Sequence, residues 1–315
     1  MAVLVCGVGY IGAALAGRLL ADGEDVVGLE SFFSSDRSAV AALGRRGRFR
    51  LVEGDVAEPG DVARALGAAD VRVAYLLAAQ SSPDDTAVPA AYTERTNLRG
   101  PRVFLEECAR RGVETVVFGS SLRVYGQPLP PGFDESTPYG RQSDLSHLSK
   151  IYAEKLLELH AARRPMRAVS ARLAIVYGLG PVMKRQPAFM TVGNRFAWQA
   201  SRGEPLRVNA GQGMIQLLHL DDAVGALRRL GDRAEPGYQP ANVLGDETSL
   251  ADLARLVASE AARRDIAVRL DLPDEPPPAP SGGRSRLDGL GVARQRDLAG
   301  GVRELLDYFA AGRAA

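Results

Sequence analysis

The 315-residue chain has a formal net charge of +1 and 46% hydrophobic residues, enough apolar material for a sizeable core in one large or two modest domains. The near-neutral charge argues against binding to nucleic acid or to an anionic membrane, and favours small-molecule partners. Its two cysteines, Cys6 and Cys108, follow no metal-ligand or disulfide spacing, and no run of 18 apolar residues occurs, so we expect no metal site, no disulfide and no transmembrane helix.

The first half of the chain alternates short β-branched runs with amphipathic stretches rich in Ala and Leu, which is the pattern of repeated βαβ units. Strands are predicted at residues 3–5, 26–29, 49–52, 73–77, 115–118 and 168–172. The clearest helix is predicted at residues 11–21, where apolar side chains share one face and Gly23 follows the last turn. Because residues 1–5 lead directly into a glycine-rich motif, no signal peptide is expected and a cytoplasmic location is predicted.

Beyond about residue 178 the alternation loosens, with helices predicted at 194–202 and 221–230. The proline-rich segment 273–283 is predicted to be an extended connection. We therefore expect an α/β fold: a Rossmann-type, doubly wound parallel sheet over residues 1–175, and a smaller substrate-binding cap over residues 176–315 that is partly interleaved with it.

The first glycine-rich motif indicates a dinucleotide site. Gly7, Gly9 and Gly12 form a G-x-G-x-x-G that follows a strand and opens a helix, with Tyr10 and Ile11 between them. In such motifs the glycines allow a tight turn, close approach of a pyrophosphate and close packing of helix on strand. An ordinary tight turn is the alternative that this motif leaves open.

Glu30 favours the dinucleotide interpretation. It ends the second predicted strand, 18 residues after Gly12, where an acidic side chain accepts hydrogen bonds from both ribose hydroxyls and repels a 2′-phosphate. The alternative is a solvated loop carboxylate. The predicted cofactor is NAD rather than NADP.

Further motifs resemble a known family. Residues 30–38, which include Ser34 and Ser35, are similar to the adenosine loop of UDP-galactose 4-epimerases, and Ser120 to Gly126 matches the pattern S-S-x-x-V-Y-G. Other matching segments are Gly54-Asp55-Val56, Leu77-Ala78-Ala79, 172–178 and 219–222. The order of these segments over residues 3–250 resembles the extended short-chain dehydrogenase/reductase family and its NAD-dependent epimerase/dehydratase group. The first motif is one residue shorter than usual in this family, a form shared by some atypical members.

The resemblance also assigns residues to the cofactor and to catalysis. Asp55 and Val56 match an adenine-contacting turn, and Leu77, Ala78 and Ala79 match a strand end beside the cofactor. Asn97 matches a family asparagine, with a helix cap as the alternative. In the family a Ser or Thr, a Tyr and a Lys act together. Ser121 matches the residue that hydrogen-bonds the reacting oxygen, and Lys150 matches the residue that holds the nicotinamide ribose and lowers the pKa of the Tyr.

The family tyrosine is replaced by Ser146, which lies four residues before Lys150 and so on the same helical face. An aliphatic hydroxyl is a poor acid-base group. His147 is one candidate replacement, because an unperturbed imidazole has a pKa of about 6.5; its alternative is a surface or capping histidine. Tyr139 is another, on the loop 131–140, with a turn aromatic as its alternative.

The positions where epimerases contact the substrate diphosphate hold Ile175 and Ile215, and Leu122-Arg123 replaces the acidic pair of the dehydratases. We therefore expect an NAD-dependent epimerase or oxidoreductase that acts on a hydroxyl or keto carbon of a sugar or sugar-nucleotide-like substrate. A catalytically silent NAD-binding sensor or scaffold, and a lyase using transient oxidation, remain alternatives. The resemblance also implies a homodimer in which helices 97–111 and 146–162 form a four-helix bundle.

Overall fold

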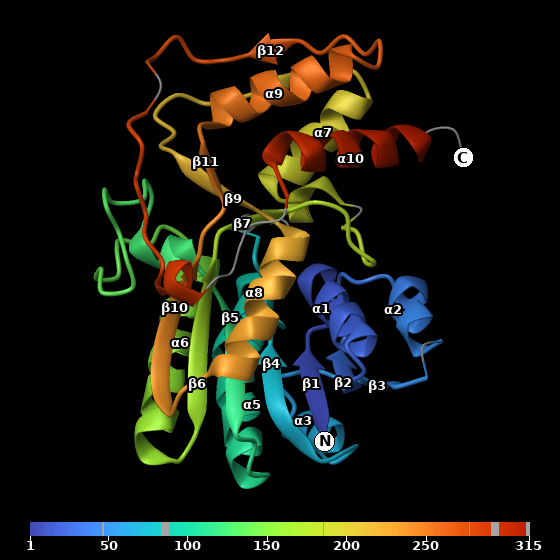
Figure 1. Ribbon diagram of the computed structural model, residues 1–315, viewed down its shortest axis with the longest axis vertical. Helices are drawn as coiled ribbons and strands as arrows, with labels where there is room; N and C mark the ends of the chain where they lie inside the picture. Colours follow the sequence, from blue (N-terminus) through green and yellow to red (C-terminus); the bar gives the residue numbers. More distant parts are fainter. Residues whose placement is uncertain (46, 83–87, 185, 277, 291–295, 313–315) are drawn as a thin grey trace.

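A computed structural model describes residues 1–45, 47–82, 88–184, 186–276, 278–290 and 296–312. Its main element is a parallel sheet of seven strands in the order β10-β6-β5-β4-β1-β2-β3 (Figure 1). The strands are β1 (Ala2–Cys6), β2 (Asp25–Glu30), β3 (Phe49–Glu53), β4 (Val71–Leu76), β5 (Thr115–Ser121), β6 (Arg167–Leu173) and β10 (Gly237–Val243). All six predicted strands are present, and the doubly wound Rossmann-type fold is confirmed.

The seventh strand, β10, was not predicted. It comes from the second half of the chain and pairs with β6 at the edge of the sheet. Pro240 lies in its middle, and a proline is tolerated only where one side of the strand needs no ladder hydrogen bond. The main sheet therefore includes residues beyond 175. The division into an NAD-binding domain and a substrate-binding region at residue 175 stays a prediction.

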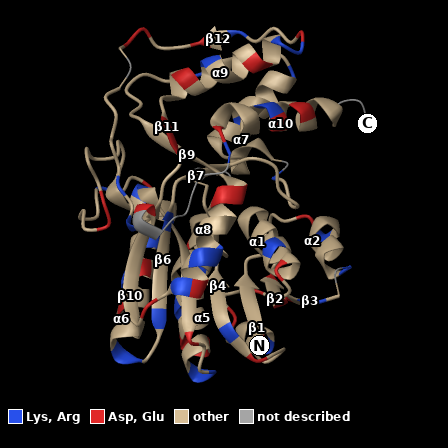
Figure 2. Cartoon of the chain, viewed as in Figure 1, with Lys and Arg blue, Asp and Glu red and all other residues tan. Residues whose placement is uncertain are grey.

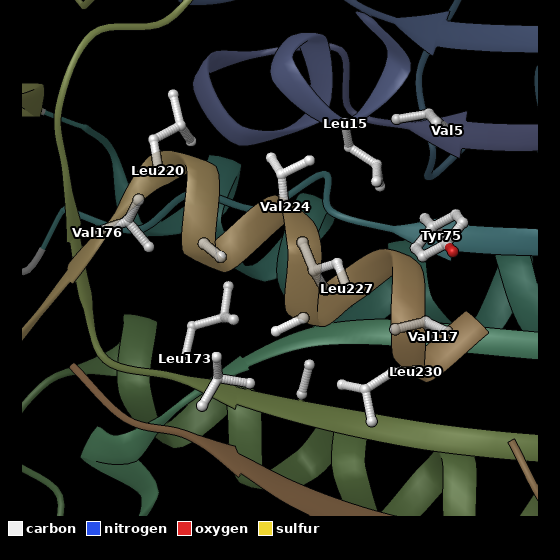
Figure 3. Packing of buried hydrophobic residues seen from close by; sticks show 14 of the residues in the cluster. Val5, Leu15, Tyr75, Val117, Leu173, Val176, Leu220, Val224, Leu227 and Leu230 are labelled. Carbon is white, nitrogen blue, oxygen red and sulfur yellow. The ribbon is translucent and has the colours of Figure 1, made fainter. Parts of the chain in front are cut away.

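Helices cover both faces of the sheet. On one face α1 (Tyr10–Ala21) packs against α8 (Leu220–Arg233), and α2 (Arg37–Gly44) lies beside β3. Figure 3 shows side chains of one buried apolar cluster, which joins Leu15 of α1, Val224, Leu227 and Leu230 of α8, and Val117 of β5. The opposite face is covered by α3 (Pro59–Leu66), α5 (Gly100–Arg110) and α6 (Leu145–Arg163). On each face, the helices bury their apolar sides against the sheet. This burial of apolar surface drives the formation of the layered fold.

The helix predicted to begin at Asn97 begins earlier. The short helix α4 (Ala90–Glu94) runs into a π-helical turn (Arg95–Arg99) and then into α5. Asn97 therefore lies inside a helical segment rather than at its cap. Its buried side chain accepts a hydrogen bond from the Gln80 N–H and donates one to the Gln80 carbonyl, both at 2.8 Å. Those two bonds hold the segment that follows β4.

A smaller cap lies above the carboxyl ends of the strands (Figure 1). Its described residues form a three-stranded sheet, a two-stranded sheet and three α-helices, with their own apolar core. The elements are β7 (Ile175–Tyr177), β9 (Ile215–His219), β11 (Asp246–Thr248), β8 (Leu206–Arg207), β12 (Leu270–Asp271), α7 (Val192–Ser201), α9 (Leu250–Ala262) and α10 (Leu298–Ala311). The described residues of 273–283 form neither helix nor strand, as predicted.

Charged residues of both signs are interspersed over the helices of the main sheet and of the cap (Figure 2). Within the described part of the chain, no helix combines the length and apolar character needed to cross a membrane.

A buried ion pair joins α6 to β6. Arg172 donates to Glu154 at 2.7 Å, and the two side chains are only 4% and 0% exposed. Ser120, Tyr139 and Tyr238 also donate hydrogen bonds to the Glu154 carboxylate. The charge of Glu154 is thus neutralised by one cation and solvated by three hydroxyls, which is the condition under which a buried carboxylate is tolerated.

Removal of Arg172 should therefore destabilise the protein far more than removal of an exposed arginine. Arg172→Leu leaves the Glu154 charge buried, and loss of one partner of a buried pair costs about 3–5 kcal/mol. Arg255→Gln, which breaks an exposed pair with Asp252, should cost less than about 1 kcal/mol. Denaturant titration measures both changes in the free energy of unfolding. Equal losses would contradict the structural role assigned to the buried pair.

Candidate active site

A cavity of about 580 Å³ lies between the carboxyl ends of the strands and the cap. Its floor comes from the residues that follow β1, β2, β4 and β5, and its roof from the cap segments around residues 182–184, 188–195 and 212–215. Ligand sites of parallel α/β sheets form at this edge. The cavity is thus the place where the predicted site residues should meet.

The glycine-rich loop forms one end of the cavity. Gly7 has a φ of +91°, and a Cβ there would lie 2.3 Å from the Ala78 backbone nitrogen. A Cβ on Gly12 would lie 1.9 Å from the Gly7 carbonyl oxygen, so both positions require glycine. Gly9 is the N-cap of α1 and supplies no capping side chain, which leaves N–H groups of the first turn available to an anion.

Glu30 ends β2 as predicted and faces the same end of the cavity. Its carboxylate accepts a hydrogen bond from the Phe32 N–H at 2.8 Å. Burial raises the pKa of Glu30, although hydrogen bonds from the amides of Phe32, Val8 and Ser31 and from the Ser35 hydroxyl counteract part of that effect. The carboxylate is therefore already held in place by the loops around it.

The remaining predicted cofactor residues divide into two groups. Most line the cavity, namely Tyr10, Ile11, Ser34, Ser35, Asp55, Val56, Leu77, Ala78 and Ala79. Asn97 does not line it, because its amide is engaged with the backbone of Gln80 and with Ser149. Its contribution to the cofactor end is to hold the backbone after β4.

Tyr10 also connects the two halves of the molecule. Its hydroxyl donates to the Gly178 carbonyl at 2.6 Å, just beyond β7 of the cap. Asn194 of α7 donates to the same hydroxyl at 3.3 Å and accepts from the Gly178 N–H at 2.9 Å. The first residue of α1 is thereby bonded to two segments of the cap.

The opposite end of the cavity brings together Ser121, Ser146, His147 and Lys150. The Lys150 ammonium donates to the Gly119 carbonyl at 2.7 Å and lies 4.9 Å from the centre of the Phe118 ring. Burial lowers the pKa of Lys150 to about 8, with Glu154 acting in the opposite direction. Lys150 therefore carries most of its charge at neutral pH and loses it as the pH rises past 8.

Asp144, which sequence reasoning did not identify, organises this end. It is the N-cap of α6, and its carboxylate accepts hydrogen bonds from the Ser146 hydroxyl at 2.6 Å and from the His147 N–H at 3.0 Å. The imidazole Nδ1 of His147 lies 2.6 Å from the other carboxylate oxygen. Burial would raise the pKa of Asp144, but these hydrogen bonds and the histidine lower it. The sequence does contain a signal for Asp144: aspartate is a preferred N-cap residue, and this one lies two residues before Ser146 at the start of a predicted helix.

Tyr139, the second predicted replacement for the family tyrosine, lies elsewhere. Its hydroxyl donates to Glu154 at 3.0 Å, and the side chain does not line the cavity. Burial, together with the Glu154 charge, raises the pKa of Tyr139 to about 12. In this position the phenol belongs to the surroundings of the buried ion pair.

Three cations on the cavity wall were not selected from the sequence. They are Arg123, Lys184 and Arg195. Burial lowers the pKa of Arg123 and of Lys184. Ile175 and Ile215, the apolar residues at the family's diphosphate positions, also line the cavity. Lys184 lies in an irregular segment with no pattern around it, so only the folded chain reveals its position.

Comparison with known proteins is consistent with this geometry. Residues 3–243 match the model of the NAD dependent epimerase/dehydratase family. A UDP-glucose 4-epimerase of Mycolicibacterium smegmatis is 28% identical over 98% of each chain. UDP-glucuronic acid decarboxylase 4 of Arabidopsis thaliana is 27% identical over 81% of this chain and 56% of its own length.

Solved structures share the fold. The UDP-glucose 4-epimerase of Bifidobacterium longum, in complex with NAD+ and UDP, superimposes with a TM-score of 0.84 at 20% identity over 99% of each chain. The enzyme of Thermotoga maritima, with UDP-glucose, gives a TM-score of 0.83 at 20% identity over 99% of this chain and all of its own. The relatives are enzymes, which does not favour the sensor or scaffold alternative. The chain belongs to the NAD-dependent epimerase/dehydratase family of enzymes and has NAD as its cofactor.

Proposed function

We propose that this protein is an epimerase or oxidoreductase that acts on a hydroxyl or keto carbon of a nucleotide sugar, with His147 as its acid-base residue. One observation carries the proposal: the imidazole of His147 is held by Asp144 on the wall of the same cavity that Ser121 and Lys150 line. The fold is that of nucleotide-sugar epimerases, and the cavity lies where such sheets bind ligands.

The cofactor end fits a dinucleotide. Gly7 and Gly12 leave no space for side chains, so the N-terminus of α1 stays open to a pyrophosphate. Glu30 would accept hydrogen bonds from the adenosine ribose hydroxyls. When bound, NAD supplies the acceptor and donor of hydride at C4 of its nicotinamide. Lys150, near the other end, would hold the nicotinamide ribose with its ammonium.

Proton transfer would fall to His147. With Nδ1–H donating to Asp144, the imidazole presents Nε2 as a proton acceptor. The Ser146 hydroxyl donates to the same carboxylate. We therefore assign Ser146 the role of orienting Asp144. Ser121 would orient the reacting oxygen, and the carboxylate would stabilise the imidazolium that forms when His147 accepts the proton.

The substrate diphosphate would be bound by cations of the cap. Ile175 and Ile215 cannot donate to phosphate oxygens, but Lys184 and Arg195 line the same cavity. Neither side chain forms an ion pair with a residue that the structure describes. The positive charges and N–H donors of Lys184 and Arg195 match the charge and the acceptors of a diphosphate.

NAD should bind more tightly than NADP, because the Glu30 carboxylate would face the 2′-phosphate in a partly buried site. Glu30→Ala should remove most of this preference. Since the pKa of Glu30 is raised, the preference should also fade as the pH falls, at a higher pH than for an ordinary carboxyl group. Calorimetric titration with both cofactors between pH 5 and 8 measures it. Tighter binding of NADP by the wild type would contradict the role of Glu30.

His147→Gln should reduce turnover by about 100-fold or more, since general acid-base catalysis contributes about 10²–10⁴-fold, while NAD affinity stays unchanged. Asp144→Asn should give a smaller loss of the same kind. Tyr139→Phe is the control: it removes one of the three hydroxyls that bond Glu154, so it should lower the free energy of unfolding by about 1–3 kcal/mol while the folded protein keeps its turnover. Steady-state assays with UDP-sugars and NAD titrations measure the three variants. A tolerated His147→Gln would rule out this residue, and a large loss for Tyr139→Phe would transfer the role to Tyr139.

We also propose a homodimer formed by α5 and α6. Three large apolar side chains of α6, Leu148, Tyr152 and Leu159, are 52%, 41% and 51% exposed, and their spacing places them along one side of the helix. Leu156 of the same helix is partly buried against the apolar core on this side of the sheet. The exposed apolar stripe is suited to a second copy of itself across a two-fold axis.

Charge on this stripe should separate the subunits. Tyr152→Glu combined with Leu159→Arg should give a monomer that still binds NAD, because neither residue lines the cavity. Tyr308→Glu, at an exposed aromatic of α10, is the control and should remain dimeric. Sedimentation velocity at micromolar concentration distinguishes these outcomes, and a monomeric wild type would overturn the dimer.

The cytoplasm is the compartment we propose. Cys6 and Cys108 are free and buried, and burial raises the pKa of both thiols. Protonated, buried thiols are suited to a reducing environment.

A further inference from the structure

Arg123 is a cation whose backbone is fixed and whose guanidinium has no hydrogen-bond or ion-pair partner in the described part of the chain. It lies in the 3₁₀ turn Leu122–Tyr125, directly after β5. Its N–H donates to the Ser121 hydroxyl oxygen at 3.2 Å, and its carbonyl accepts from the Gln142 amide at 3.0 Å. The side chain lines the cavity. The turn therefore presents the guanidinium to the cavity from a defined position.

No residue that the structure describes forms a hydrogen bond or an ion pair with this guanidinium. Burial lowers the pKa of Arg123, and the charge of Asp144 offsets part of that cost from a distance. Asp144 is itself engaged by Ser146 and His147. Arg172, by contrast, is buried with its charge neutralised by Glu154. Loss of water without gain of a partner among the described residues is unfavourable for a cation, and this favours an anionic ligand at Arg123.

The position of Arg123 restricts where on the ligand this anion can be. Arg123 is two residues from Ser121 and interacts electrostatically with the carboxylate that holds His147. These are the residues to which the proposed function assigns the reacting oxygen and its proton. The anion therefore lies at the reacting end of the substrate, whereas Lys184 and Arg195 of the cap remain available for the diphosphate.

We propose that Arg123 binds a carboxylate on the sugar ring, which makes the substrate a nucleoside diphosphate derivative of a uronic acid. This inference rests on the proposed function. The planar guanidinium matches the two oxygens of a carboxylate in a bidentate geometry. The diphosphate of the nucleotide offers similar oxygens, and it is present in acidic and neutral nucleotide sugars alike. A comparison of two such sugars therefore separates the two anions.

The test is calorimetric titration of the NAD-loaded full chain with UDP-glucuronic acid and with UDP-glucose. The wild type should bind the acidic sugar about 10- to 100-fold more tightly, which is the range for hydrogen bonds between charged groups. Arg123→Gln should reduce this ratio to near one by weakening only UDP-glucuronic acid. Arg123→Lys keeps the positive charge but loses the planar, bidentate guanidinium. It should restore part of the ratio between the two affinities.

Arg141→Gln is the matched control, because Arg141 is exposed, lies outside the cavity and carries the same charge. It should leave both affinities unchanged. Equal wild-type affinities for the two sugars would overturn the inference, as would an equal loss for both in Arg123→Gln, which would assign Arg123 to the diphosphate. Failure of both sugars to bind, with NAD bound, would instead overturn the nucleotide-sugar substrate class of the proposed function.

Discussion

Glu154 and Arg172 face each other between α6 and the sheet, where neither charge has access to water. Three hydroxyls complete the solvation of the carboxylate, and one of them belongs to Tyr139 of the loop before α6. Arg172 also donates to the Tyr125 hydroxyl at 2.7 Å. A helix, three strands, a turn and a loop thus meet at a single buried charge. Its desolvation cost is offset only when all of them are in place.

The proposed active-site residues are close to this pair in the sequence and in space. Lys150 precedes Glu154 by one helical turn, so both project from the same side of α6. Ser121 follows Ser120, whose hydroxyl bonds Glu154. Fixing the carboxylate therefore also fixes the rotation of α6 and the end of β5, and with them the distance between the lysine and the serine. Polar groups held in this way need little reorganisation when a charged ligand arrives.

Much of the fold could be predicted from the sequence, because strands buried on both faces leave a strong local signal. The strand β10 could not, since its proline and polar residues suit an edge and only the pairing with β6 makes it a strand. The cofactor end was similarly accessible through the glycine motif and Glu30. The substrate end was not, because it depends on side chains that converge from distant segments. From the sequence, Asp144 could be recognised only as a helix N-cap. Lys184 and Arg195 could be recognised only from their positions in the folded region above the strands.

The hydroxyl of Tyr10 has a consequence for the way the two ligands influence each other. Tyr10 follows Gly9 of the glycine-rich loop, and its hydroxyl bonds Gly178, just beyond β7, and Asn194 of α7, a helix whose residues Val192 and Arg195 line the cavity. Any displacement of the loop is therefore carried into the roof through one rigid aromatic ring. Thermodynamic linkage makes such a connection reciprocal. If the dinucleotide changes the affinity for the sugar, the sugar changes the affinity for the dinucleotide by the same factor. How tightly the cofactor is retained then depends on the bound substrate as well as on the glycine-rich loop.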